Sequence, residues 1–540
     1  MEFENIEIAD PDPKNVKKVI KKKIFYRNVR AYIKEYCEVS SIQGLSYLTK
    51  DISLFERCWW IIILLLCLGG CSNMIYKVSK KWIDTPVLVS LATKDTSINK
   101  IPFPAVTICP ESKISRQCVN YSQVLRMRRS GKGHLVPEAE NDVFDNMALL
   151  CSANNYINST SSKKLNDYSE FLEKCRSVDL SISHCKFGGV EMPCSEILQP
   201  ILTDEGLCYS FNMFDVRDIY SDVNQMKYYK ESHRKPDYDI DDGYPDDTTR
   251  NFYPRRVLSS GAGSALVVVL LTKKSDVYYS CRDFTLQGMR VALHMPARIP
   301  RPNQVFFPVG LNELVVAPVT PSYMGTTKKI KEYEANKRNC YFGTERKLKY
   351  FRVYTQSNCN LECWTNYTIQ ECGCTHFYMP RDANTSICPL DHRQCLQTAS
   401  ETFAVSSFPT KYHKEKKSKG KLDSDCDCLP ICSDLNYNAE VSRGKWNWND
   451  PNGANVGNLK KYFKDYHASA VKVFFKSSYF LPTEKSELYG VVDFLSNTGG
   501  ILGLFTGFSL FSLAEIVYFL SVRLIENYRQ WGYWAGRVEH

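Results

Sequence analysis

The sequence predicts an α+β membrane protein in which two transmembrane helices flank a large, disulfide-rich extracellular domain. Three observations lead to this fold class: two long hydrophobic segments, a dense set of cysteines between them, and N-glycosylation sequons confined to the same region. The formal net charge of +10 is spread over 540 residues and gives no indication of nucleic-acid binding.

Two hydrophobic segments are long enough to cross a bilayer, which takes about 20 apolar residues. Residues 58–76 contain no charged residue, and residues 494–522 contain one, Glu515. The first segment starts too far along the chain for a cleavable signal peptide. We therefore expect an N-terminal tail, a first span, an extracellular domain, a second span and a C-terminal tail, at 1–57, 58–78, 79–487, 488–522 and 523–540.

The cysteines and sequons orient the chain across the membrane. Of the 22 cysteines, 18 fall between Cys109 and Cys432, an even number typical of disulfides formed in an oxidising compartment. All four sequons lie in the same region, at Asn120, Asn158, Asn366 and Asn384. We therefore expect a plasma-membrane protein whose middle region is extracellular and glycosylated and whose two tails are cytoplasmic.

Elements of both kinds are expected in the extracellular domain. Strand-like runs occur at 101–110, 264–271, 290–296 and 312–320, and helical patterns occur near 360–371 and 457–466. Residues 229–250 are polar and rich in charge, which predicts an exposed loop. This mixture of patterns indicates the α+β class.

Two segments raise the question of metal binding. The cysteine run at 359–380, followed by CDCLPIC at 426–432, has spacings that could hold zinc, but the sequons place it in an oxidising compartment, which favours disulfides. The acidic run at 237–241 resembles a calcium loop, yet its glycine comes one place late, at Gly243, and Thr248 occupies the twelfth position, where a glutamate would close the loop. We expect no metal site.

The basic N-terminal segment at 16–36 has interleaved apolar residues. It fits two descriptions equally: a helix lying on anionic membrane lipid, or a solvated helix next to the membrane.

The second hydrophobic segment carries features that a simple anchor does not need. Its glycines repeat as G-x-x-x-G-x-x-x-G, a pattern that lets helices pack closely in lipid and by itself indicates no more than dimer packing. Polar side chains also recur at every third position, at Thr506, Ser509, Ser512 and Glu515. On an ideal helix each step of three residues turns by about 300°, so the two ends of this series would point to opposite sides.

One of those sides would therefore meet lipid, at a cost of about 2.5–3.5 kcal/mol for an acid at mid-membrane. Either the helix breaks near 507–509, or several helices enclose water on a broad face, and non-helical backbone at membrane depth is tolerated where it lines a cavity. Both alternatives indicate a conduit, which one helix cannot form alone. A ring of Glu515 carboxylates would attract cations, the competing interpretation being a carboxylate that reaches the inner headgroups.

Enzyme motifs are absent from the sequence: there is no G-x-S-x-G, H-E-x-x-H or phosphate-binding loop. We therefore expect no enzymatic activity. An anchored receptor would not need the polar series or Glu515, so a channel is favoured over it.

Five stretches carry a family resemblance. They are SSIQGLSYL, FPAVTICP, GLCYSFN, the cysteine run ending at Met379-Pro380, and GGILGLFTGFS leading to Glu515. In this order the chain resembles the degenerin/epithelial sodium channel family, which includes the acid-sensing channels, and within it the insect pickpocket branch.

The resemblance implies a homotrimer or a heterotrimer with related subunits that conducts sodium, is blocked by amiloride and needs no cofactor. It implies a β-rich palm and β-ball with helical finger, thumb and knuckle parts. By similarity the selectivity filter is Gly507, Phe508 and Ser509, with Thr506, Ser512 and Glu515 in the pore. Ser496 matches the position where a bulky side chain holds these channels open.

The resemblance also implies seven disulfides. They are Cys109–Cys208, Cys185–Cys194, Cys340–Cys432, Cys359–Cys428, Cys363–Cys426, Cys372–Cys395 and Cys374–Cys388. The pairing of the remaining extracellular cysteines stays open, at Cys118, Cys151, Cys175 and Cys281.

Two positions depart from the family pattern. The His-Gly pair of the re-entrant gating segment appears here as Gln43-Gly44, and the middle filter residue is Phe508 rather than a small one. The stimulus stays open among protons, peptides, small ligands and force. The alternative to a channel gated through its extracellular domain is a two-span cysteine-rich receptor, or a subunit that conducts only with an obligate partner.

Overall fold

The computed structural model describes most of the chain. Residues outside the described part are 1–27, 51, 85–86, 152–167, 222, 224–233, 246–251, 278–280, 282–285, 407–425, 449–461, 489, 532–533 and 535–540. The chain divides into two compact units, one made of Met1–Leu88 with Glu487–His540 and the other of Val89–Ser486.

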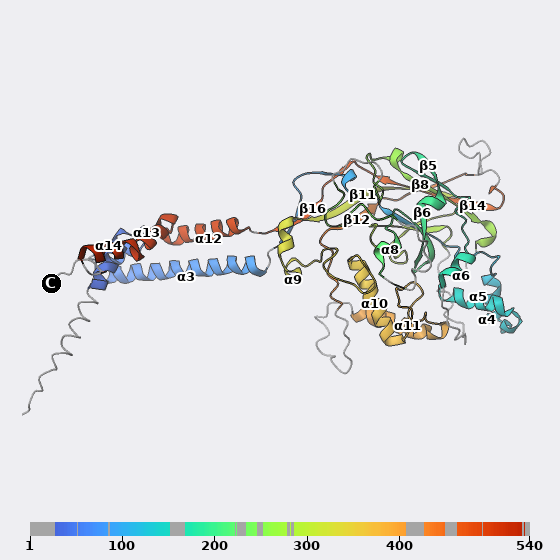
Figure 1. Cartoon of the computed structure of the whole chain (residues 1–540), viewed down its shortest axis with the longest axis horizontal. Coiled ribbons are helices and arrows are strands. Elements are labelled where there is room, and N and C mark those ends of the chain that lie inside the picture. Colours follow the sequence, from blue (N-terminus) through green and yellow to red (C-terminus); the bar gives the residue numbers. More distant parts are fainter. Residues whose placement is uncertain are drawn as a thin grey trace, which may run out of the picture. The chain divides into compact units, whose positions relative to one another are not determined.

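The first unit is helical. A helix at 28–39 precedes α2 (Leu45–Thr49) and α3 (Leu54–Asp84), and the C-terminal part forms α12 (Val491–Thr506), α13 (Leu510–Leu520) and α14 (Val522–Trp531). Helices α3 and α12 run side by side, with Trp82 stacked on Phe494 at a centroid distance of 4.6 Å (Figure 1). The segment expected at 16–36 lies partly outside the described residues, and its described end is helical.

Within the described residues, one helix, α3, is long and apolar enough to cross a membrane. It extends beyond the expected 58–78 at both ends. The helices on either side of Gly507–Ser509 qualify together as a second span if a pair bent by 77° is counted as one broken span.

The second unit is built on a nine-stranded sheet. Its path is β1-β16-β11-β14-β8-β4-β5, and β12 and β13 also pair with β11. The long β11 pairs in parallel with β14 and β16, and antiparallel with β12 and β13. The strands are β1 (Val87–Leu91), β4 (His184–Phe187), β5 (Val190–Pro193), β8 (Leu266–Lys273), β11 (Glu313–Thr326), β12 (Asp434–Ala439), β13 (Ser442–Lys445), β14 (Tyr466–Phe475) and β16 (Thr483–Glu487).

A second, antiparallel sheet of five strands lies in the same unit, in the order β10-β9-β3-β7-β6. A two-stranded ladder pairs β2 with β15. The strands are β2 (Thr96–Ser97), β3 (Ala105–Pro110), β6 (Leu198–Thr203), β7 (Gly206–Phe211), β9 (Met289–His294), β10 (Phe307–Val309) and β15 (Tyr479–Phe480). The run at 101–110 thus contains β3, and the runs at 264–271, 290–296 and 312–320 overlap β8, β9 and β11, as predicted.

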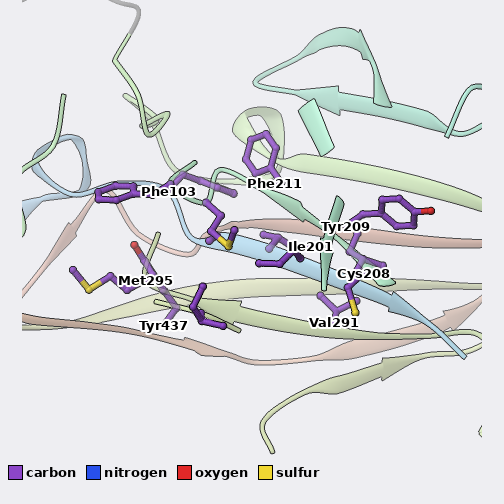
Figure 2. Packing of buried hydrophobic residues seen from close by; sticks show 14 of the residues in the cluster. Phe103, Ile201, Cys208, Tyr209, Phe211, Val291, Met295 and Tyr437 are labelled. Carbon is purple, nitrogen blue, oxygen red and sulfur yellow. The ribbon is translucent and has the colours of Figure 1, made fainter. Parts of the chain in front are cut away.

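The main hydrophobic core joins the two sheets. Phe103, fully buried, packs edge-on against Phe187, Phe211 and Phe475 at centroid distances of 5.3–6.0 Å. Figure 2 shows Phe103 and Phe211 in this core with Ile201, Val291 and other buried side chains. Burying an aromatic side chain of this size contributes up to about 3 kcal/mol.

Helices cover the sheets in two groups. The first group is α4 (Tyr121–Arg129), α5 (Glu138–Ala148) and α6 (Tyr168–Lys174), which surround a separate cluster that includes Phe144 and Met147. The second is α10 (Gln356–Cys372) and α11 (Arg393–Ser406), which lie side by side (Figure 1). Short helices are α7 (Cys194–Ile197), α8 (Val216–Ile219) and α9 (Ala335–Arg338).

The 3-10 turns are η1 (Ile98–Lys100), η2 (Gly133–Leu135), η5 (Ala262–Ser264), η6 (Lys274–Asp276), η7 (Lys328–Glu332) and η8 (Leu390–His392). The helix expected near 360–371 lies within α10. The helix expected near 457–466 is wrong at its described end, where a turn leads into β14; residues 457–461 lie outside the described part.

Nine disulfides brace this unit. Seven are the pairs that the resemblance implied. The other two, Cys118–Cys175 and Cys151–Cys281, pair the four cysteines that the sequence left open. Among the described residues no group of three or more His, Cys, Asp or Glu is placed to hold a metal ion.

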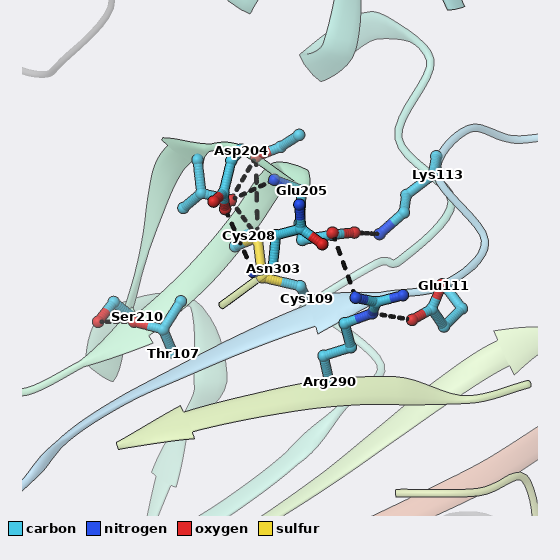
Figure 3. The surroundings of a disulfide bond; sticks show 12 residues. Thr107, Cys109, Glu111, Lys113, Asp204, Glu205, Cys208, Ser210, Arg290 and Asn303 are labelled. Atoms are coloured by element: carbon cyan, nitrogen blue, oxygen red, sulfur yellow. Dashed lines mark hydrogen bonds and ion pairs between the residues drawn. A yellow bond between two sulfur atoms is a disulfide. The ribbon is translucent and has the colours of Figure 1, made fainter. Parts of the chain in front are cut away.

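Buried charges surround the Cys109–Cys208 disulfide (Figure 3). Glu205, whose side chain is fully buried, accepts from Lys113 Nζ at 2.9 Å and from Arg290 Nη1 at 3.3 Å, and Arg290 also pairs with Glu111. Two acids thus balance two bases, which offsets the cost of removing each charge from water.

The acidic loop expected at 229–250 is exposed in part and anchored in part. In its described part Tyr238 and Ile240 are buried, and Asp241 Oδ2 accepts from Gly343 N at 2.8 Å. Burial raises the pKa of the Asp241 carboxyl, and the hydrogen bond from Gly343 opposes that rise. Tyr238 and Ile240 anchor this part of the loop, whereas Asp237, Asp239 and Asp242 are exposed, so the prediction of an exposed loop is confirmed in part.

Candidate functional site

The second apolar segment is broken at the predicted place. Helix α12 ends at Thr506 and is capped by Gly507, which has a φ of 67° and whose N–H donates to Gly503 O; α13 begins after Ser509. Glycine adopts this left-handed conformation without the steric penalty that a Cβ would bring. Residues 507–509 are therefore non-helical backbone inside a segment of otherwise apolar helix.

Ser509 starts the second half of the segment. Its hydroxyl accepts from Ser512 N at 3.3 Å, and Ser512 Oγ accepts from Ser509 N at 3.0 Å, which forms a reciprocal capping box. A serine at this position satisfies backbone donors that a new helix leaves unpaired. The glycine and the serine together therefore specify where one helix stops and the next begins.

The segment before α2 closes over this break. Gln43 N donates to Thr506 O at 2.9 Å, which pairs one of the last carbonyls of α12. A Cβ added at Gly507 would lie 2.8 Å from Gln43 Cγ, so the glycine also leaves room for the glutamine side chain. Gly44 has a φ of 94° at the start of α2, a conformation that favours glycine.

Ser41 contacts the acid predicted for the inner mouth. Glu515 Oε2 accepts from Ser41 N at 2.9 Å and from Ser41 Oγ at 3.0 Å, and Ser41 Oγ lies 2.7 Å from Ser512 Oγ. The carboxylate is half-buried, with these donors supplied from the same chain. Sequence reasoning missed Ser41 because 474 residues separate it from Glu515 and no local pattern connects them.

The helix at 28–39 packs on the end of the same segment. Tyr32 hydroxyl donates to Phe519 O at 2.6 Å, Tyr36 packs edge-on against Phe519, and Glu35 pairs with Arg523 at 2.6 Å. These contacts hold the helix at 28–39 against the end of α13 and the start of α14. They were not predicted from the sequence.

The remaining predicted site residues occupy different surroundings. Ser512 is fully buried and Thr506 is 6% exposed, its hydroxyl donating to Leu502 O at 2.7 Å. Phe508 is half-buried, and Ser496 is exposed on α12. The structure therefore brings Thr506, Ser512 and Glu515 together around segment 40–43, and leaves Ser496 apart from them.

The sequons differ in accessibility. Asn366 and Asn384 are exposed, whereas Asn120 is half-buried and caps α4 by accepting from Gln123 N. Asn158 lies outside the described residues.

Comparison with known proteins places the chain in a family. The sequence model described as amiloride-sensitive sodium channel matches residues 36–519. The chain belongs to this family. The family consists of ion channels, not enzymes, so the degenerin-type resemblance is confirmed.

Several relatives of this chain are members of the same family. Pickpocket protein 28 of Drosophila melanogaster is 27% identical over 90% of this chain and 78% of its own length. Sodium channel protein Nach of the same species is 24% identical, covering 92% and 88%. Acid-sensing ion channel 1A of Danio rerio is 23% identical, covering 90% and 87%.

Proposed function

We propose that this chain assembles into a trimeric, sodium-permeable channel of the plasma membrane, as a homotrimer or with related subunits. The observation that carries the proposal is the helix break at 507–509 directly above Glu515. Non-helical backbone at membrane depth is stable where it is covered by protein or lines a water-filled path. Three copies around an axis supply such a path.

In this channel the carbonyl groups of residues 507–509 replace part of the hydration shell of a sodium ion. Thr506 and Ser512 support the pore wall with hydroxyls that are buried within the chain, and a ring of Glu515 carboxylates attracts cations and repels anions. No bound cofactor takes part, and Na⁺ is the permeant species. Amiloride blocks the current.

The disulfide-rich unit lies outside the cell and controls the opening of the channel, and both tails lie in the cytoplasm. The oxidising environment needed for nine disulfides and the exposure of Asn366 and Asn384 support this topology. Strand β1 follows α3 in the chain and β16 precedes α12, and the two strands are neighbours in one sheet. A displacement of β1 and β16 in that sheet is therefore passed along the chain to both α3 and α12.

The central experiment is expression of Ser496→Phe and Ser496→Val, with Ser496→Ala as a size control. The large side chains should give constitutive, sodium-favouring current that amiloride blocks, and the alanine variant should stay closed. Absence of current from both large variants, with the protein at the surface, would contradict a homomeric channel.

Phe508 favours a second candidate, a subunit that conducts only in mixed trimers, because three phenylalanines at the narrowest level are bulky. Co-expression with a related subunit separates the two: current that appears only then supports the mixed trimer.

Glycosidase treatment tests the topology separately. It should reduce the mass of the intact protein, and replacing the four sequon asparagines by glutamine should abolish that shift.

A further inference from the structure

The hydroxyl of Ser41 lies between two side chains of α13. It is 2.7 Å from Ser512 Oγ and 3.0 Å from Glu515 Oε2, and the Ser41 backbone N–H reaches the same carboxylate oxygen at 2.9 Å. Three short contacts thus converge on one residue of the segment that precedes α2.

Hydrogen-bond chemistry fixes the direction of these contacts. An ionised carboxylate only accepts, so the single Ser41 hydroxyl proton points to Glu515 Oε2. Ser512 must then donate to Ser41 Oγ, while Ser512 Oγ itself accepts from Ser509 N at 3.0 Å. The result is a directed chain from the helix break, Ser509 N–H to Ser512 to Ser41, that ends on the Glu515 carboxylate.

We propose that Ser41 is a positioning residue of the conduction pathway: it fixes the Glu515 carboxylate and links it to the break at 507–509. The inference rests on the proposed channel function. Both donors bind Oε2, so Oε1 is the oxygen presented to a passing cation. Because two hydrogen bonds share the negative charge, Ser41 weakens the hold of the carboxylate on cations and favours their release.

The geometry is tested first, without any need for current. In full-length protein carrying Ser41→Cys with Ser512→Cys, mild oxidation with copper phenanthroline should join the N- and C-terminal fragments after cleavage at a site that no native disulfide spans. The matched pair Ser40→Cys with Ser512→Cys should not, because Ser40 Oγ faces its own backbone and accepts from Ile42 N. Equal cross-linking of the two pairs, or none in either, overturns the contact.

The role is tested in the Ser496→Phe background by block with Mg²⁺ applied to the cytoplasmic face of excised patches. Ser41→Ala removes one charge-assisted hydrogen bond and should lower the half-blocking Mg²⁺ concentration about tenfold. Ser41→Thr, which keeps the hydroxyl, and Ser40→Ala should both retain the reference value.

Coupling to the acid decides whether Ser41 acts through Glu515. In a Glu515→Gln channel, Ser41→Ala should change the Mg²⁺ block less than twofold. An equal change in both backgrounds, or no change in either, overturns the proposal. Cross-linking without current from Ser496→Phe, either alone or co-expressed with a related subunit, leaves the contact standing and rejects the channel function and this role together.

Discussion

Gly507→Ala tests the geometry of the helix break. Gly507 has a φ of 67°, and a non-glycine residue in the left-handed region costs about 1–2 kcal/mol. In a continuous helix, alanine is favoured over glycine by about 1 kcal/mol. The substitution therefore shifts the balance from the broken to the continuous helix by about 2–3 kcal/mol, or about 30- to 140-fold.

The new methyl group would also press on Gln43. Its Cβ would lie 2.8 Å from Gln43 Cγ, and because that side chain is flexible it can move away at low cost. Adding Gln43→Ala to the Gly507→Ala chain should remove the contact with the new methyl group and leave the penalty of the left-handed backbone conformation unchanged. Gly500→Ala is the matched control, because a Cβ there meets no atom within 4 Å in the chain.

The assay is sodium and potassium current in the Ser496→Phe background, normalised to surface protein. Gly507→Ala should reduce sodium current at least tenfold and bring the permeability ratio of sodium to potassium toward unity, and Gly500→Ala should do neither. A Gly507→Ala channel with the reference current and an unchanged reversal potential would refute the argument from backbone conformation.

Three further predictions concern the disulfide-rich unit, each measured as thermal stability of the full-length protein in detergent. Glu205→Gln should destabilise it by about 3–5 kcal/mol, because Lys113, whose side chain is 2% exposed, loses its anionic partner. Replacing Cys151 and Cys281 by alanine opens a loop of 130 residues and should cost about 5 kcal/mol. Burial lowers the pKa of His294 to about 4, below its usual 6.5, so the unfolded state binds the proton at a higher pH than the folded state does. The free energy of unfolding should therefore fall by about 3 kcal/mol between pH 6.5 and 4. His294→Gln should remove that part of the loss.

Each of these predictions has an internal comparison. Lys476→Ala breaks an exposed ion pair with Glu440 and should change stability by less than about 1 kcal/mol. Loss of Cys185–Cys194, which closes 9 residues, should cost about 2.6 kcal/mol. Stability losses of equal size at the buried and exposed ion pairs, or at the long and short loops, would contradict the reasoning. So would a His294→Gln variant with the same acid sensitivity.

Local sequence determined several features of this protein. The position of the helix break follows from Gly507 and Ser509, since a left-handed residue ends one helix and a capping serine starts the next. The apolar α3 and the strands β8 and β11 follow from runs of apolar residues. Conformational preferences of this kind act within a few residues, so a short window of sequence contains them.

The tertiary structure decided which distant residues become partners in disulfides, hydrogen bonds and ion pairs. Four cysteines allow three pairings, and Cys118–Cys175 with Cys151–Cys281 is selected by how the helices around Phe144 pack. The contact of Ser41 with Glu515 joins residues 474 positions apart, and Glu205 finds Lys113 and Arg290 from three different parts of the chain. Such partners depend on the path of the whole backbone, because an ion pair or hydrogen bond forms only within a few ångströms, and sequence spacing sets no distance over hundreds of residues.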